Sequence, residues 1–376
     1  MTGAATDAIV TEWSAFAASA LDGLGAADFR TRWKAMAAEG ILGVIASDGS
    51  AGPVTSALAA IEGLGLGGAP AGLCYALASQ RFGIQFPLQG IGTPVWSALA
   101  DGVEQGDLLL CHALTEERGG SDPLSMTTRA VRTDGGQWRL TGRKAFVTAA
   151  PVADHALVFA RTSAERTPFA LSAFLVDLST PGVHRSDPFP KVALTDVPMG
   201  ALDFDDVRLE PDRLVGRVGA GLALLATTTS WERGLLLGYA LGPMRRVLER
   251  TIDWTKSRRQ FERRMGESHL VAGRIADMAL AVHRSRTLVY AMAERLDRGV
   301  SARSLSSDAA LTKISIAEDY LDFSRQAATL GGVRSFVAET GLTADLADPM
   351  AATVYAGPND LLRVSVARGL GLPVQN

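Results

Sequence analysis

The chain has 376 residues, enough for two or three domains with buried cores, and its 47% hydrophobic and 20% charged residues are ordinary for a soluble globular protein. The formal net charge of −3, without a basic run interleaved with aromatics, argues against a nucleic-acid partner or an anionic membrane partner. Two cysteines, Cys74 and Cys111, are too few for a disulfide framework and predict a reducing, cytoplasmic environment.

The beginning of the chain and its apolar stretches predict neither secretion nor membrane insertion. The first basic residue is Arg30, so the charged start of a secretory signal is absent. The longest apolar stretch, 218–227, is too short to cross a bilayer.

Residues 1–108 are predicted to form an N-terminal helical domain. Apolar side chains recur at three- and four-residue spacing at Ile9, Trp13, Phe16, Ala17 and Leu21, which is the pattern of an amphipathic helix. Glycine-rich breaks at 39–53 and 63–72 separate the segments that follow.

The run Gly63–Gly68 matches the G-x-G-x-x-G dinucleotide fingerprint letter for letter. That fingerprint binds a pyrophosphate only when a strand leads into it and a helix follows. Here 56–62 reads as helical, so we interpret the glycines as a flexible loop between helices.

Residues 109–216 are predicted to form a middle β-barrel domain. Alternating apolar residues and turn residues indicate strands at 127–131, 138–141, 155–161, 171–178 and 201–207. Asp134-Gly135-Gly136 suits a hairpin connection between the first two.

Residues 217–376 return to helical periodicity and are predicted to form a C-terminal four-helix bundle. Long helices are expected at 220–258 and 270–297, and a third should begin at the N-cap pair Ser307-Asp308 and end at Gly331-Gly332. Segregated helical, β and helical thirds favour three packed layers over a βαβ alternation.

Several common kinds of site have no signature here. The five histidines lack metal-ligand spacing, and the chain contains neither a G-x-S-x-G elbow nor a Walker loop. We therefore expect no metal site.

Two segments of the middle region carry groups that suit a flavin. In 114–122, Thr115 and Ser121 supply hydroxyls, and Gly119-Gly120 lets the backbone approach a ligand closely. A flavin ring needs such donors around its edge to tune its electronics. Taken alone, this segment could be a polar turn at a strand end.

Together with Gly142–Thr148, this segment resembles the flavin-contacting signature of the acyl-CoA dehydrogenase family. Further landmarks of that family are matched at 204–207, 276–278 and 330–332, and the resemblance extends over 108–370. It implies an acyl-CoA dehydrogenase-like fold, bound FAD, and α,β-dehydrogenation of an acyl thioester to the trans-2-enoyl thioester. The family also works as a homo-oligomer, here a tetramer or a dimer.

The resemblance implies a set of FAD-binding positions on both sides of a subunit contact. Phe146 takes the place of an aromatic residue beside the isoalloxazine, and Arg258 that of an arginine reaching a neighbouring subunit's FAD, although a solvated basic helix end is the alternative. The implied cofactor-binding residues are His112, Leu114, Thr115, Ser121, Phe146, Thr148, Arg258, Gln260, Phe261, Gly331, Gly332 and Asp360.

Many family members carry their catalytic carboxylate near the C-terminus, but the corresponding residue here is Ala356, which cannot accept a proton. The resemblance therefore implies that the base lies elsewhere in the chain. The isovaleryl-CoA dehydrogenase type places its base before an arginine on a helix, and Glu232-Arg233 matches that arrangement. On a helix, Leu236 and Tyr239 would share a face with Glu232, and apolar burial would raise its pKa toward neutrality. The alternative is a solvated Glu-Arg pair on a helix surface.

The resemblance also assigns the residues around the thioester. The backbone N–H of Ala356 would hold the thioester carbonyl and stabilise the developing enolate. The implied substrate-binding residues are Ser121, Trp231, Arg233, Tyr239, Tyr355 and Gly357.

Departures from the family pattern leave two other functions open. Pro358, Ala328 and Glu262 replace residues that usually lie on the FAD side of the subunit contact. Such changes are compatible with a specialised member acting on carrier-protein thioesters in secondary metabolism, with an acyl carrier protein or electron-transfer flavoprotein as partner. The alternatives are a flavin-dependent monooxygenase on the same fold and a flavin-free scaffold or binding protein.

Overall fold

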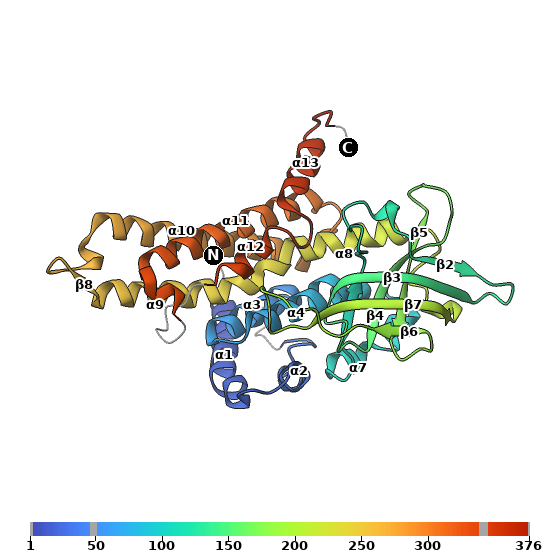
Figure 1. Ribbon diagram of the computed structural model, residues 1–376, viewed down its shortest axis with the longest axis horizontal. Coiled ribbons are helices and arrows are strands. Elements are labelled where there is room, and N and C mark those ends of the chain that lie inside the picture. Colours follow the sequence, from blue (N-terminus) through green and yellow to red (C-terminus); the bar gives the residue numbers. More distant parts are fainter. Residues whose placement is uncertain (1–2, 46–50, 338–344, 375–376) are drawn as a thin grey trace.

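A computed structural model describes residues 3–45, 51–337 and 345–374. Along the chain, an N-terminal group of helices is followed by a sheet and then by a C-terminal group of long helices, and the sheet lies at one end of the molecule (Figure 1). This order confirms the predicted succession of helical, β and helical parts. The predicted boundaries at 108 and 216 fall just before β1 and α8. Within the described residues, no helix is long and apolar enough to cross a membrane.

The N-terminal part is helical, as predicted. Ile9, Trp13, Ala17 and Leu21 are all buried, which confirms the amphipathic stripe. Its helices are α1 (Ala4–Phe16), α2 (Phe29–Ala38), α3 (Pro53–Gly67), α4 (Ala71–Gln80), α5 (Phe86–Ile91), α6 (Pro94–Ser97) and α7 (Ala100–Glu104), with π-helical turns at Ala17–Leu21 and Arg81–Gln85.

The prediction of a loop at 63–68 was wrong, because the glycines lie inside α3 and at its end. A Cβ at Gly63 would lie 2.6 Å from the Val10 carbonyl oxygen of α1, and one at Gly65 would lie 2.5 Å from Pro243. The glycines therefore allow neighbouring backbones to approach α3 more closely than any side chain would permit.

The central part is a seven-stranded sheet with the order β1-β4-β2-β3-β7-β6, in which β5 pairs with β4. Its strands are β1 (Leu110–Ala113), β2 (Arg129–Arg132), β3 (Trp138–Thr148), β4 (His155–Arg161), β5 (Leu171–Asp177), β6 (Val183–Arg185) and β7 (Met199–Leu209). β2 starts later than predicted, because Thr127 and Thr128 donate their backbone N–H groups to the Glu116 carboxylate instead.

The C-terminal part consists mainly of four long helices. They are α8 (Gly221–Leu235), α9 (Leu241–Ser257), α10 (His269–Asp297) and α11 (Ser306–Gly331), followed by α12 (Ala347–Ala352) and α13 (Asn359–Gly369). A short hairpin of β8 (Arg259–Gln260) and β9 (Arg263–Arg264) joins α9 to α10. The N-cap of α11 is Leu305, so Ser307 and Asp308 lie inside its first turn and not at the predicted cap.

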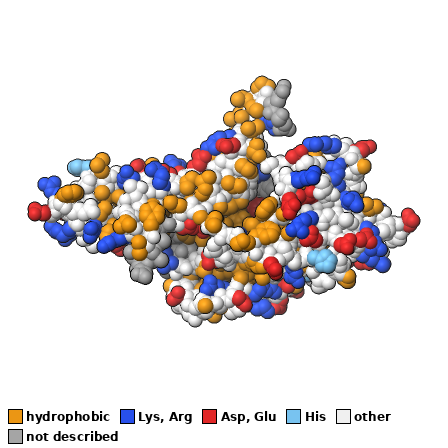
Figure 2. Space-filling view, viewed as in Figure 1, with side chains coloured by type: hydrophobic (Ala, Val, Ile, Leu, Met, Phe, Trp, Pro, Cys, Tyr) orange, Lys and Arg blue, Asp and Glu red, His pale blue; other side chains and the backbone are white. Residues whose placement is uncertain are grey.

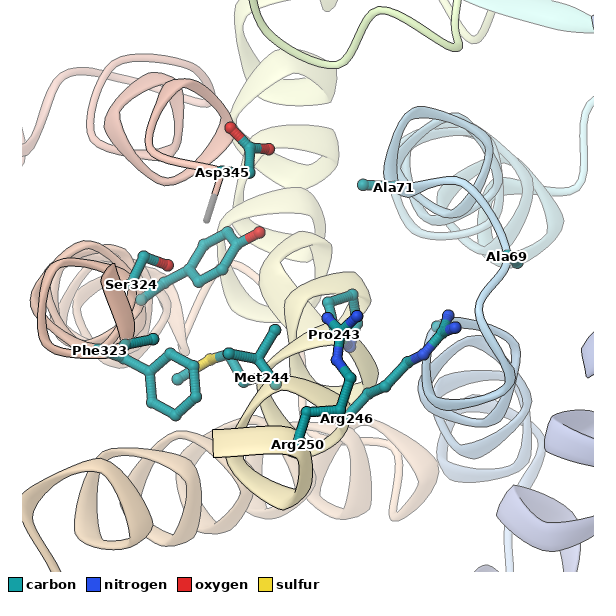
Figure 3. A pocket seen from close by; sticks show the side chains of 13 residues that line it. Ala69, Ala71, Pro243, Met244, Arg246, Arg250, Phe323, Ser324 and Asp345 are labelled. Carbon is teal, nitrogen blue, oxygen red and sulfur yellow. The ribbon is translucent and has the colours of Figure 1, made fainter. Parts of the chain in front are cut away.

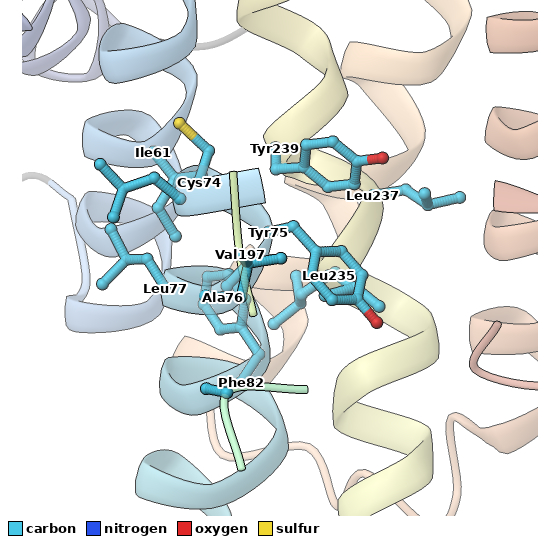
Figure 4. Close-up of a cluster of buried hydrophobic side chains, with 14 of the residues drawn as sticks. Ile61, Cys74, Tyr75, Ala76, Leu77, Phe82, Val197, Leu235, Leu237 and Tyr239 are labelled. Atoms are coloured by element: carbon cyan, nitrogen blue, oxygen red, sulfur yellow. The ribbon is translucent and has the colours of Figure 1, made fainter. Parts of the chain in front are cut away.

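The single helix predicted for 220–258 is interrupted by a 3-10 segment at Leu236–Ala240. Its backbone packs tightly on α3, since a Cβ at Gly238 would lie 2.2 Å from the Leu58 side chain. The interruption changes the helical phase after Glu232. Tyr239 therefore lies among core residues between α4 and the α8–α9 segment, close to Tyr75 (Figure 4).

α13 projects from the rest of the molecule (Figure 1). Leu362 and Val366 pack it against Ala310 and Ile314 of α11. Leu361 of the same helix is exposed, and Figure 2 shows hydrophobic side chains along this projection.

Candidate active site

A cavity of about 610 Å³ lies where the three parts of the fold meet. Its walls come from α4, β1, the loop after β1, β3, α8 and the turn before α13. The cavity brings together the predicted residues His112, Leu114, Thr115, Ser121, Phe146, Thr148, Glu232, Arg233, Tyr355, Ala356 and Gly357. Residues about 240 positions apart in the sequence thus face one space, as a single site requires.

Glu232 faces this cavity from α8 and is only partly exposed, through the cavity itself. Burial raises the pKa of its carboxyl to about 7, while the Arg233 charge and the Ser79 hydroxyl oppose that rise. Ser79 Oγ lies 3.5 Å from Glu232 Oε1, too far for a strong hydrogen bond. A carboxyl that titrates near pH 7 suits a general base, because it is partly ionised and still basic enough to accept a proton.

Gly83 of the π-helical turn Arg81–Gln85 packs against this carboxyl. A Cβ at Gly83 would lie 3.7 Å from Glu232 Oε1, an ordinary van der Waals contact. Gly83→Ala should therefore fold normally and exclude more water from the carboxyl, which raises its pKa further. Since Glu232 has to be ionised to act as the predicted base, we expect kcat/KM to fall about threefold near pH 6 and to be unchanged well above the pKa.

The pH dependence of kcat/KM measures this effect. Gly90→Ala is the matched control, because a Cβ at Gly90 of α5 meets no atom within 4 Å. A Gly83→Ala profile that overlays both the wild type and Gly90→Ala would show that this contact does not set the pKa of Glu232.

Ala356 lies in the turn before α13 and lines the cavity. It has a φ of 54°, and Gly357 follows with a φ of 103°. Left-handed backbone at an alanine costs of the order of 1 kcal/mol or more, so surrounding contacts must hold it. Arg233 contributes one of them, because its Nε donates to the Ala356 carbonyl oxygen at 2.8 Å.

Glu116 organises the segment that carries Thr115 and Ser121. Burial alone would raise the pKa of its carboxyl, but hydrogen bonds from Thr127 and Thr128 lower it to about 2. Lys144 Nζ donates to Glu116 Oε1 at 3.1 Å and to the Leu114 carbonyl oxygen at 3.0 Å. Glu116 and Lys144 were not predicted as site residues, although both lie in the two segments that carry the flavin-binding groups.

Phe146 and His112 border the cavity on the side of the sheet. Phe146 has a φ of 56°, at a register shift between β3 and β7, and remains 54% exposed. Burial and the Lys144 charge lower the pKa of His112 to about 4, so its imidazole is neutral near pH 7. Its Nε2 lies 3.4 Å from the Thr228 hydroxyl.

Tyr75 is a further cavity residue that the sequence analysis missed. Burial and the nearby Glu232 charge raise the pKa of its hydroxyl. Its ring packs edge-on against Tyr355, at 5.0 Å between centroids. Tyr75 and Ser79 lie four positions apart on α4, so helical spacing was the available signal, but no motif marked that helix.

Eight predicted residues lie outside the cavity lining, and three of them are Trp231, Tyr239 and Asp360. Trp231 stacks on Phe86, with ring centroids 5.4 Å apart. The Tyr239 hydroxyl lies 2.7 Å from that of Tyr355, so Tyr239 supports a cavity residue from behind. The Asp360 side chain is exposed and lies 3.3 Å from Arg363.

Five further predicted cofactor residues lie elsewhere. Arg258 follows α9, Gln260 and Phe261 lie in the hairpin of β8 and β9, and Gly331 and Gly332 lie at the end of α11 (Figure 1). Trp254 of α9 contacts both segments: its Nε1 donates to the Leu330 carbonyl oxygen, and its ring lies 5.7 Å from the Arg258 guanidinium. Phe261 is 96% exposed. Within one chain, this group does not reach the cavity that Glu232 lines.

A second cavity, of about 200 Å³, lies between α9, α11 and the helices α3 and α4 (Figure 3). Arg246, Arg250, Tyr320 and Asp345 line it together with apolar side chains. No predicted site residue borders it.

The fold and the cavity agree with sequence comparisons. Residues 111–207 match the acyl-CoA dehydrogenase middle domain, and residues 219–371 match the acyl-CoA dehydrogenase C-terminal domain. The chain belongs to the acyl-CoA dehydrogenase family.

Its relatives include L-prolyl-[peptidyl-carrier protein] dehydrogenases. The Pseudomonas fluorescens enzyme is 31% identical over 345 residues, covering 91% of this chain and 90% of the relative. The Serratia sp. enzyme is 31% identical over 313 residues, covering 83% of this chain and 80% of the relative.

Solved structures show the same fold over the whole chain. The prolyl acyl carrier protein oxidase AnaB has a TM-score of 0.91 at 26% identity, and covers 99% of this chain and 100% of its own. The FAD complex of PigA has a TM-score of 0.90 at 28% identity, and covers 100% of this chain and 99% of its own. These findings confirm the predicted fold class, the FAD cofactor and the assignment to dehydrogenases that act on CH–CH bonds.

The residues of the cavity fit an isoalloxazine. Thr115, Ser121 and Thr148 present hydroxyls to one space, and the Phe146 ring borders it. A Cβ at Gly120 would lie 2.8 Å from Thr115 Oγ1, so the glycine leaves room that a side chain would fill. These are the hydrogen-bonding and stacking groups that a flavin edge requires.

Proposed function

We propose that this chain oxidises an acyl group bound to a carrier protein, with Glu232 as the catalytic base in the manner of the isovaleryl type. The observation that carries the proposal is the Glu232 carboxyl itself, with a pKa raised to about 7 at the wall of the cavity. Among the residues that the structure describes, no other carboxyl lines this cavity.

The proton transfer follows from this geometry. An ionised Glu232 removes the α-proton of the thioester, and the resulting charge on the thioester oxygen is stabilised by the Ala356 N–H. Bound FAD supplies the acceptor for the hydrogen and the electron pair that leave the β-carbon. The Arg233 Nε donates a hydrogen bond to the Ala356 carbonyl oxygen. The Arg233 charge lowers the pKa of Glu232 by less than burial raises it.

A prolyl group on a peptidyl carrier protein is the proposed substrate, supported by the names of the two relatives above. A coenzyme A thioester is the alternative presentation of the acyl group. For reoxidation, electron-transfer flavoprotein remains a candidate partner.

The FAD site is proposed to be completed by a second copy of the chain, in a dimer or tetramer. Arg258, Gln260 and Phe261 lie far from the cavity at a projecting hairpin, where Phe261 is almost fully exposed. An arginine and an exposed aromatic ring at such a tip suit contact with the diphosphate and adenosine of a neighbouring cofactor.

Anaerobic titration of the FAD-loaded protein tests the substrate. We expect prolyl-loaded peptidyl carrier protein to bleach the flavin absorbance, and prolyl-CoA and butyryl-CoA to do so at least about tenfold more slowly, because remote contacts of the carrier contribute binding energy to the transition state. Equal rates with prolyl-CoA would favour coenzyme A. A flavin that no thioester bleaches would contradict the dehydrogenase assignment.

A further inference from the structure

The turn at 355–358 has two backbone N–H groups, those of Ala356 and Gly357, that border the cavity and donate to no described protein atom. No described protein atom accepts a hydrogen bond from the Ala356 N–H, whereas the Tyr355 N–H before it donates to the Ala351 carbonyl oxygen. Ala356 also lines the cavity. Its N–H is therefore available to a ligand, and the orientation of this donor depends on how the turn is held.

Two cations from different helices hold consecutive carbonyls of this turn. Arg233 of α8 donates to the Ala356 carbonyl oxygen at 2.8 Å. Lys313 of α11 donates from Nζ to the Gly357 carbonyl oxygen at 2.9 Å and to Asn359 Oδ1 at 2.7 Å. The two charge-assisted hydrogen bonds thus hold the two peptides that directly follow the one carrying the Ala356 N–H, and such bonds are shorter and stronger than neutral ones.

Keeping a lysine at this position is energetically costly. Lys313 is 1% exposed, and burial followed by repulsion from Arg233 lowers its pKa to about 8, although Glu318 opposes the change. A neutral donor could hold the same carbonyl without the cost of burying a charge. The charge itself is therefore the feature that needs an explanation.

We propose that Lys313 is a positioning residue for thioester activation: by fixing the Gly357 carbonyl, it directs the Ala356 N–H at the thioester oxygen. The inference rests on the proposed function, since it assumes that this oxygen accepts the Ala356 hydrogen bond. Such a donor matters most when negative charge develops, so its misplacement lowers kcat more than it raises KM.

The test compares Lys313→Met, Lys313→Gln and the surface control Lys256→Met in FAD-loaded protein. An acetyl thioester on the carrier, isotope-labelled at its carbonyl, is the probe, because it has no β-carbon and cannot be dehydrogenated. We expect the wild type and Lys256→Met to lower the infrared stretching frequency of the bound carbonyl. In Lys313→Met, most of this lowering of the carbonyl frequency should be lost. With the prolyl-loaded carrier as substrate, kcat should fall about 10²-fold while KM stays within about threefold, and the FAD content should be unchanged.

Lys313→Gln keeps a hydrogen-bond donor without the charge. Its carbonyl frequency and its kcat should lie between those of the wild type and those of Lys313→Met. If Lys313→Met does not fold, this variant carries the test. A folded Lys313 variant with wild-type carbonyl frequency and kcat would overturn the inference, as would a wild type that does not shift the carbonyl.

The probe needs no base, so its result is independent of the assignment of Glu232. Rapid substrate oxidation in a Glu232 variant would contradict the proposed base while the carbonyl shift still reported on Lys313.

Discussion

Glu232→Gln should leave FAD bound and slow flavin reduction by the acyl thioester about 10⁴-fold. Glutamine keeps the shape of the side chain beside Gly83 and Ser79, but its amide cannot accept the α-proton. The substitution changes the group proposed to contact the substrate α-carbon and leaves the protein hydroxyls proposed to bind the flavin unchanged. The FAD content should therefore equal that of the wild type. Anaerobic stopped-flow absorbance, with the visible spectrum of the resting protein, measures both quantities.

Glu249→Gln is the matched control for this experiment, because Glu249 is an exposed residue of α9, outside the cavity. Its rate of flavin reduction should equal that of the wild type. Reduction of Glu232→Gln within about tenfold of the wild-type rate would rule out Glu232 as the base. Loss of FAD in this variant would instead assign the carboxyl a structural role.

Glu62→Ala should lower the free energy of unfolding by about 3–5 kcal/mol. Glu62 is fully buried in α3 and accepts hydrogen bonds from Arg245 at 2.5 Å, from Arg286 at 3.1 Å and from the Tyr290 hydroxyl at 2.7 Å. Removing the carboxylate takes the paired anion from Arg245 of α9 and leaves Arg286 of α10 with the exposed Asp7 as its anionic partner. The midpoint of thermal unfolding, at fixed FAD concentration, should fall by of the order of 10 °C.

The control for this variant is Asp253→Ala, which breaks an exposed ion pair with Lys256 on α9. Exposed pairs contribute little, so its midpoint should stay close to that of the wild type. A Glu62→Ala midpoint equal to that of Asp253→Ala would show that the network does not hold α3 to the C-terminal helices.

Local sequence patterns were sufficient for the motifs of the middle region. The segment around Thr115 and Ser121 and the strand ending at Thr148 border one cavity because both lie close to a strand end of the same sheet. The two residues that hold this arrangement, Glu116 and Lys144, carried no motif of their own. Their function depends on burial and on contacts with Thr127 and Thr128, which only the folded chain reveals.

The sequence by itself indicated the order of helical and β parts and the flavin segments, and it predicted Glu232 rather than Ala356 as the base, because periodicity and residue chemistry are local properties. The tertiary structure decided which residues support those groups. The Gly63–Gly68 run was predicted as a loop but lies in α3 and at its end, because the glycines allow close helix packing. The 3-10 segment at 236–240 places the Tyr239 hydroxyl beside that of Tyr355 and outside the cavity lining. Lys313 lies about 80 positions from Arg233, yet both hold one turn, because long-range packing and not sequence spacing brings such buried charges together.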